Sequence, residues 1–144
     1  MHPHFIEHIF AISERYRVTI RAAIDANELG IGAMHVRSLT VIAETLDCTA
    51  NNIVTKLSRD KAQVARLVKE LLAAGLIEKD AHPEDKRSQI LTLSSSGNTL
   101  MKQLKAAKAT IQLQMTQGLS THELDLFNTI AHKIADNLVC NNTL

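Results

Sequence analysis

Apolar residues recur every three or four positions through most of this chain, a spacing that places them on one side of an α-helix. The first such stretch begins at Pro3, which suits a first helical turn, and runs to about Asn27. The segment "ELGIGA" separates it from a second predicted helix, and "LDCTANN" separates that helix from a short third one. The apolar positions of these three predicted helices are Phe5, Ile9, Ile12, Tyr16, Ile20 and Ala23, then Val36, Leu39, Ile42 and Leu46, then Ile53, Val54 and Leu57.

The stretch "SRDKAQVARLVKELLAAGLIEKD", residues 58–80, predicts a fourth helix with a well-defined beginning and end. Asp60 can cap its N-terminus, and Gln63 three residues later completes the spacing of a capping box. Gly75 supplies the stop signal, since glycine readily adopts the left-handed conformation that ends a helix. The apolar stripe of this helix consists of Val64, Leu67, Val68, Leu71 and Leu72.

Two short alternating segments follow, at residues 76–80 and 89–93, and predict a β-hairpin. The segment between them, "AHPEDKRS", is charged and contains a proline, so it should form a long solvated tip. Ser94 can then cap a fifth helix that ends near Gly118, and "STHE" offers a capping box for a sixth. The apolar stripes of the last two helices are Leu100, Leu104, Ala107, Ile111 and Met115, then Leu124, Phe127, Ala131, Ile134 and Leu138.

The predicted order is therefore ααααββαα, a mostly α fold with a small β-hairpin, in a single domain over residues 1–144. The short third helix, the tight turn, the fourth helix and the hairpin together match a winged helix-turn-helix. In such a module the second helix enters the major groove of DNA with its N-terminal residues against base edges.

The polar face of the fourth helix supports this hypothesis. With about 100° between successive residues, the side opposite the apolar stripe carries Ala62, Arg66, Lys69 and Ala73, and Gln63, Ala65 and Glu70 lie on its flanks. Residues 49–69 contain five basic residues and one acidic residue, a local charge of +4 in a chain of net charge +1. A face that is basic or small in its first half suits an approach to phosphates and bases.

Each of these residue types has a chemical role in reading DNA. Arginine and lysine bind guanine O6 and N7 or neutralise phosphates, Gln63 can pair with adenine, and alanine can contact a thymine methyl group. On the hairpin tip, Lys86 and Arg87 would reach an adjacent minor groove, and Asp85 could orient the Arg87 guanidinium by an ion pair. The predicted DNA contacts are Asn51, Lys56, Arg59, Lys61, Ala62, Gln63, Ala65, Arg66, Lys69, Lys86 and Arg87.

With these motifs in place, the chain resembles the MarR family of winged helix-turn-helix transcriptional regulators. "LSRDKAQVARLVKELLAAGLIEKD" resembles the recognition helix of that family leading into the first wing strand, and "HPEDKRSQILTLSSSG" resembles its wing signature. The residues that match the wing signature are Asp85, Arg87, Leu91, Thr92 and Gly97. The recognition helix departs from the family, which often opens it with Ser, Arg, Pro and Thr where this chain has Asp60, Lys61, Ala62 and Gln63. Base preference therefore does not carry over.

The resemblance implies a homodimer on a pseudo-palindromic operator. In it, dimerisation helices at about residues 3–27 and 94–140 flank a winged module at about residues 34–93. The first, fifth and sixth predicted helices agree with this, because their apolar stripes are wider than one small module could bury. Half-sites should lie about 10 base pairs apart.

The resemblance also implies a ligand-responsive repressor that releases DNA when a small amphipathic or phenolic effector binds. Polar residues that could face such a ligand are Tyr16, Arg17, His35 and Arg37.

His4 and His8 share a helical face and could chelate zinc, but scattered N-terminal histidines are more commonly unrelated to metal, so neither a metal nor another cofactor is expected. Cys48 and Cys140 are expected to be packing residues. The peroxide-sensing members use a cysteine in the first helix, which this chain lacks, and another redox role for either thiol stays open.

Composition excludes several other classes of protein. With 45% hydrophobic and 22% charged residues, no signal peptide and no run long enough to span a membrane, the sequence predicts a cytoplasmic globular protein. No phosphate-binding loop, nucleophile or paired carboxylates can be assigned, so an enzyme is not expected. Two alternatives remain: a winged-helix module that binds a protein, and an intracellular small-ligand carrier or redox sensor that reads no bases directly.

Overall fold

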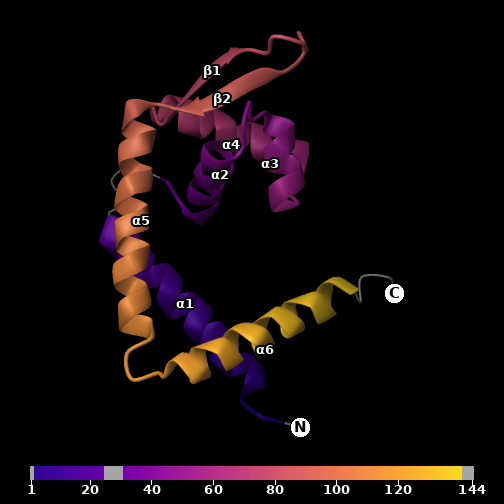
Figure 1. Ribbon diagram of the computed structural model, residues 1–144. Coiled ribbons are helices and arrows are strands. Elements are labelled where there is room, and N and C mark those ends of the chain that lie inside the picture. The colour runs from indigo at the N-terminus through magenta and orange to yellow at the C-terminus, as the bar shows by residue number, and fades with distance from the viewer. Residues whose placement is uncertain (1, 25–30, 141–144) are drawn as a thin grey trace. The chain divides into compact units, whose positions relative to one another are not determined.

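The computed structural model describes residues 2–24 and 31–140, which form six helices and one antiparallel pair of strands (Figure 1). The elements are α1 (Phe5–Ile24), α2 (Ala33–Glu44), α3 (Ala50–Leu57), α4 (Lys61–Ala73), β1 (Ile77–Ala81), β2 (Gln89–Leu93), α5 (Ser95–Met115) and α6 (Thr121–Cys140). The predicted order ααααββαα is confirmed. The expected continuation of the first helix to Asn27 and most of the "ELGIGA" break lie outside the described residues.

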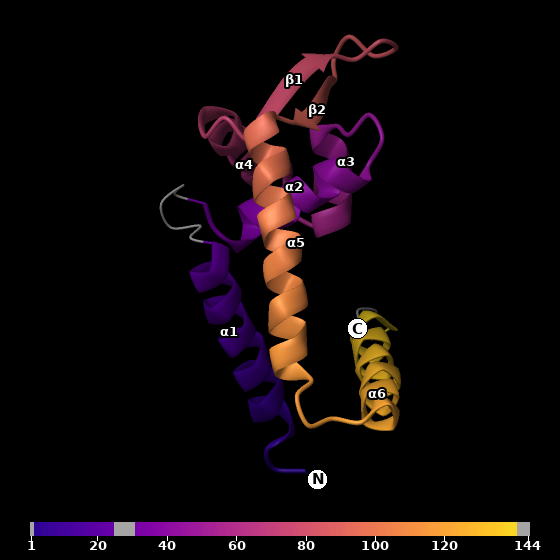
Figure 2. The ribbon, with the colours of Figure 1, turned by 60° about the vertical axis from the view of Figure 1, so that its left-hand side comes forward.

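The chain divides into two compact units, residues 1–108 and residues 109–144. The first unit contains α1 to α4, the hairpin and the larger part of α5. In both ribbon views α2, α3 and α4 gather next to the hairpin, where α5 begins (Figure 1, Figure 2). The second unit consists of the end of α5, the turn at Gly118 and α6.

The core of the first unit joins α2, α3, α4 and the hairpin. Leu39, Ile53, Val64 and Leu71 are fully buried, and Leu76 at the start of the wing is almost so. Burial of each such side chain contributes ~1.5–3 kcal/mol relative to exposure. Ile20 of α1 and Met101 and Ala107 of α5 pack against the same cluster. Most of the predicted apolar stripes therefore do face a core.

One predicted stripe residue does not belong to its helix. Leu46 was expected to close the apolar stripe of the second helix, but α2 ends at Glu44 and Leu46 is 91% exposed in the turn that follows. The chain turns there through Asp47, whose φ of 50° is left-handed. Cys48 then supplies the next fully buried side chain. Periodicity alone could not detect this, because Leu46 keeps the helical spacing although the helix has ended.

Side-chain caps set the helix boundaries. Asp60 accepts the Gln63 backbone N–H at 2.8 Å, and Ser94 Oγ accepts the Gly97 N–H at 3.1 Å. Ser120 and Glu123 form a reciprocal capping box at the start of α6. These three predicted starts are confirmed, although only the Asp60 half of the expected Asp60–Gln63 capping box is formed.

The turn between α4 and β1 connects the fourth helix directly to the wing. Gly75 has a φ of +72°, and its N–H donates to the Leu72 carbonyl while the Leu76 N–H donates to that of Leu71. This pair of bonds is a Schellman motif, in which glycine avoids the Cβ penalty of the left-handed conformation. The predicted stop at Gly75 is confirmed, and it brings the next residues into β1.

The hairpin pairs β1 and β2 in antiparallel register, with Ile77 opposite Leu93 and Ala81 opposite Gln89. A further bond anchors it to the helices, because the Leu91 N–H donates to the Cys48 carbonyl at 2.7 Å. The residue-91 amide therefore faces the turn between α2 and α3. The wing is thus joined to the helices by the Schellman turn at Gly75 and by the backbone bond to Cys48.

Candidate nucleic-acid interface

The turn between α3 and α4 sets the angle of the helix-turn-helix. Thr49 caps α3 by accepting the Asn52 N–H, and α3 ends at Leu57. Ser58 then adopts a left-handed conformation with a φ of 51°, and Asp60 opens α4. Three residues thus separate the two helices, which suits the short turn of a helix-turn-helix.

The two faces of α4 have separate roles. Val64 and Leu71 are fully buried, Val68 and Leu72 are half-buried against the same core, and Leu67 is half-buried. The predicted apolar stripe therefore fixes α4 to the module. The opposite face is exposed at every position for which DNA contact was predicted on this helix: Lys61, Ala62, Gln63, Ala65, Arg66 and Lys69.

The remaining predicted contacts on the helices are exposed as well. Asn51 and Lys56 lie on α3, and Arg59 lies in the turn, where its Nη2 contacts the Met34 sulfur at 3.7 Å. Exposure is a requirement for DNA contact, so the DNA-binding roles of these residues stay predictions. Together they surround the exposed N-terminal half of α4 with positive charge, which favours an approach to a phosphate backbone.

Arg66 differs from the other cations because it is already paired. Its Nε donates to Glu70 Oε1 at 2.9 Å, one helical turn away. Glu70 Oε2 is in turn bonded to His35 Nε2 of α2 at 2.5 Å. Arg66 first and His35 second lower the pKa of the Glu70 carboxyl, since both stabilise its ionised form. The exposed face of α4 therefore carries one ion pair that is anchored from a second helix.

The wing tip is ordered by two side chains. His82 Nδ1 accepts the backbone N–H groups of Glu84 and Asp85, each at 3.1 Å. Asp85 accepts the Arg87 backbone N–H at 2.9 Å and the Ser88 hydroxyl at 3.0 Å. The Arg87 N–H and then the Ser88 hydroxyl lower the pKa of the Asp85 carboxyl. Lys86 and Arg87 remain exposed at the end of this turn.

The expected ion pair between Asp85 and the Arg87 guanidinium was wrong in its geometry. The Asp85 carboxylate contacts residue 87 through the backbone and orders the turn, while the salt bridges of the described residues do not include this pair. A short acidic side chain two residues before an N–H readily forms such an Asx-type turn, which competes with a bond to the longer arginine side chain. The guanidinium is left for a partner.

Comparison with known proteins relates this arrangement to a family. Residues 29–88, which include α2, α3, α4 and β1, match the sequence model of the MarR family. In these residues the chain is similar to the MarR family. A curated relative, the uncharacterized HTH-type transcriptional regulator YdgJ of Bacillus subtilis (strain 168), is 23% identical over 109 residues, which cover 76% of this chain and 66% of that protein.

Solved structures agree with the fold. A MarR/EmrR family transcriptional regulator from Acinetobacter sp. ADP1 is 25% identical, with a TM-score of 0.73 and coverage of 94% of this chain and 95% of that one. A mutant MarR from E. coli, solved in complex with operator DNA, has a TM-score of 0.75 at 19% identity and covers 89% and 91% of the two chains, a likeness in fold alone. The relatives are transcriptional regulators rather than enzymes, as expected for this chain.

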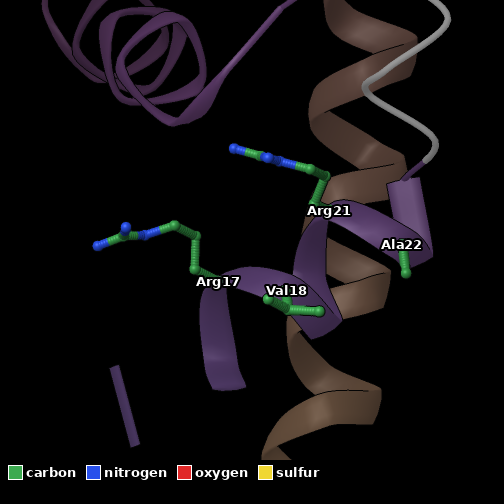
Figure 3. A pocket seen from close by; sticks show the side chains of 4 residues that line it. All are labelled: Arg17, Val18, Arg21 and Ala22. Carbon is green, nitrogen blue, oxygen red and sulfur yellow. The ribbon is translucent and has the colours of Figure 1, made fainter. Parts of the chain in front are cut away.

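The four residues expected to face an effector come from two helices, α1 and α2. His35 is half-buried and uses both ring nitrogens, one on Gly32 and one on Glu70. Arg37 is exposed on α2, and Tyr16 is half-buried on α1. Arg17 lines a hollow on α1 that it shares with Val18, Arg21 and Ala22 (Figure 3). The two arginine side chains extend to the same side of the helix there.

The N-terminal histidines are engaged with neighbours on α1. His4 Nδ1 is bonded to Glu7 Oε2 at 2.6 Å, and the rings of His4 and His8 meet edge to face with centroids 6.3 Å apart. Among the described residues there is no group of three or more histidine, cysteine or acidic side chains able to hold a metal ion. In the same part of the chain, no helix has the length and apolarity needed to cross a membrane.

Cys48 is fully buried, and this burial raises the pKa of its thiol. A buried thiol with a raised pKa forms little reactive thiolate, which agrees with a packing role. The Cys140 side chain lies outside the described residues.

Three functional candidates were missed in the sequence: Glu70, His35 as its partner, and His82. The i,i+4 spacing of Arg66 and Glu70 is a readable signal for an ion pair on a helix. The contact between His35 and Glu70 joins residues 35 positions apart and had no such signal.

Proposed function

We propose that this chain is a homodimeric MarR-family regulator that binds double-stranded DNA sequence-specifically and acts as a ligand-responsive repressor on a pseudo-palindromic operator. The observation that carries the proposal is the exposed face of α4, whose cations and small residues all point away from the buried Val64–Leu71 side. A helix presented in this way can enter the major groove, while the exposed Lys86 and Arg87 at the wing tip reach beside it.

Dimerisation is supported by apolar surface that the single chain leaves uncovered. On α1, Phe5, Ile9 and Ile12 of one predicted stripe are each nearly half exposed. On α6, Phe127 is 57% and Leu138 is 71% exposed. Contiguous apolar patches on soluble proteins mark interaction sites, and a second copy of the chain would cover both helices. In this proposal residues 1–144 act as one domain, with dimerisation helices at about 3–27 and 94–140 around a winged module at about 34–93.

The proposed effector site lies on α1. The hollow on α1 would suit a small amphipathic or phenolic compound with an anionic group, because two arginines, Arg17 and Arg21, line it together with apolar Val18 and Ala22 (Figure 3). Release of DNA by such a compound would make the chain a cytoplasmic ligand-responsive repressor.

The test is selection of bound sequences from random duplex DNA by the purified full-length protein, followed by titration of the selected DNA at several salt concentrations. A DNA reader enriches one pseudo-palindromic motif, and its affinity falls by about one logarithmic unit per tenfold rise in salt for each phosphate contact. A winged-helix module for a protein partner, or a ligand carrier, would enrich no motif. Repeating the titration with a panel of aromatic acids would reveal the effector as a loss of binding.

A further inference from the structure

Three side chains form a continuous hydrogen-bonded row from α2 to the exposed face of α4. His35 Nε2 is bonded to Glu70 Oε2, and Glu70 Oε1 accepts from Arg66 Nε at 2.9 Å. Exposure increases along this row, from 14% for the His35 side chain through 41% for Glu70 to 81% for Arg66. The row therefore begins close to the core and ends at the surface proposed to meet DNA.

The orientation of the His35 ring is fixed at both nitrogens. Its Nδ1 accepts the Gly32 backbone N–H at 3.0 Å, so Nδ1 carries no proton. The proton of the neutral ring is then on Nε2, which donates it to Glu70 Oε2. A ring held at both ends can hold the carboxylate of Glu70 in one rotamer, although Glu70 itself lies at the surface.

This arrangement restricts the Arg66 side chain but leaves most of its N–H donors available for binding. Only Nε is committed, and the four N–H groups on the two terminal nitrogens remain free. Those terminal groups form the edge of the guanidinium that can bind guanine O6 and N7 together. A preorganised side chain loses less conformational entropy on binding than a freely rotating one.

We infer that Glu70, held by His35, is a positioning residue that makes Arg66 a reader of bases rather than a mobile phosphate contact. The inference rests on the proposed function, since it requires that α4 enters the major groove. A carboxylate on a DNA-facing surface would otherwise repel phosphates, and this unfavourable charge is offset by the pairing with Arg66. An ordinary exposed i,i+4 pair has little energetic value, but this one is tied to a second helix through a mostly buried histidine.

The experiment compares specific with random DNA in a double-mutant cycle. Dissociation constants are measured for the selected motif and for a random duplex of equal length at one salt concentration. The proteins are the wild type, Arg66→Ala, Glu70→Ala and the double variant. We expect Glu70→Ala to lower the ratio of specific to random affinity about tenfold, the discrimination of one bidentate base contact. Its affinity for random DNA should be unchanged or higher, because a negative charge is lost.

The double variant tests whether Glu70 acts on the affinity ratio through Arg66. If Glu70 acts through Arg66, then Glu70→Ala causes no further fall in the ratio once Arg66 is alanine. His35→Ala should lower the ratio in the same direction by a smaller factor, and should have no effect in the Glu70→Ala background. Glu78→Ala, which removes an exposed carboxylate from β1 instead of α4, is the matched control and should leave the ratio unchanged.

Two outcomes would overturn the inference while leaving DNA reading intact. The ratio could stay at the wild-type value in Glu70→Ala, or it could fall equally in the Arg66→Ala background. An unchanged ratio in which both DNAs lose affinity by the same factor would show a structural role only, and thermal unfolding of Glu70→Ala and the milder Glu70→Gln would reveal it directly. If the wild type selects no motif at all, both the proposed function and the inference fail.

Discussion

Gly97 lies directly against the carbonyl oxygen of Leu76, so that a Cβ built on residue 97 would be 2.0 Å from that oxygen. Residue 97 is in the first turn of α5, and Leu76 immediately precedes β1. The same carbonyl accepts the Ser94 N–H at 3.0 Å, and the Ser94 hydroxyl donates to the Gly75 carbonyl at 2.6 Å. The end of the wing is thus closed onto its own beginning, and a glycine is required at the point of closest approach.

Gly97→Ala should destabilise the protein by about 2–3 kcal/mol, the upper range for overpacking a tight site, because the clash is with backbone and no side chain can move aside. The measurement is the urea concentration at the midpoint of unfolding, which should fall while the dependence of the free energy of unfolding on urea stays unchanged. Ser96→Ala, an exposed change in the same turn, is the control and should stay within about 0.5 kcal/mol of the wild type. Equal stability of the two variants would contradict the close contact.

Arg87→Ala should leave the fold unchanged and lower affinity for the selected DNA about tenfold. The reason is that residue 87 is exposed on the wing tip and its guanidinium is not held by Asp85. A gel-shift titration at fixed salt measures the loss, and unfolding curves verify the fold.

Lys105→Ala is the control for this change, since it removes an exposed cation from α5, away from the wing. Unchanged binding by Arg87→Ala would show that the wing does not read DNA. An equal loss in both variants would indicate a general effect of net charge instead.

Order at the wing tip should depend on pH through Asp85. The pKa of its carboxyl is lowered from the ordinary value of 3.8, so the ionised, bonded form is fully present above that value. The tip contacts are then lost as the pH falls through the lowered pKa. In an NMR titration the Arg87 amide resonance should shift with a midpoint below 3.8. Asp85→Asn should abolish that shift, and a midpoint at or above the ordinary value would contradict the bond to the Arg87 N–H.

Ile9→Glu should convert the proposed dimer into monomers, measured by light scattering after size-exclusion chromatography. Ile9 is 45% exposed on the apolar stripe of α1, and a buried unpaired carboxylate would cost several kcal/mol at an interface. Val18→Glu is the matched control, because Val18 is exposed and lies nine residues later, about two and a half turns around the helix, on the opposite face. Dimers in both variants, or monomers in both, would argue against this stripe as the interface.

Local patterns in the amino-acid sequence specify the elements, their order and the division of α4 into a buried and an exposed face. These properties depend on spacing between near neighbours, such as the stripe from Val64 to Leu72, the cap at Asp60 and the glycine at residue 75. Such local rules act within one or two helical turns, and they predicted the starts of α4, α5 and α6 correctly. Leu46 shows their limit, because its spacing fits a helix that the chain has already left.

Packing between elements settles which polar side chains are bonded to one another. His35 was a candidate for a ligand, and it is bonded to Glu70 on another helix. Asp85 was expected at the Arg87 guanidinium, and it accepts the backbone instead. Whether a long polar side chain reaches a distant partner, its own backbone or solvent depends on distances between elements, which are set only when α2 packs on α4 and the hairpin closes on Cys48. Periodicity contains no information about those distances.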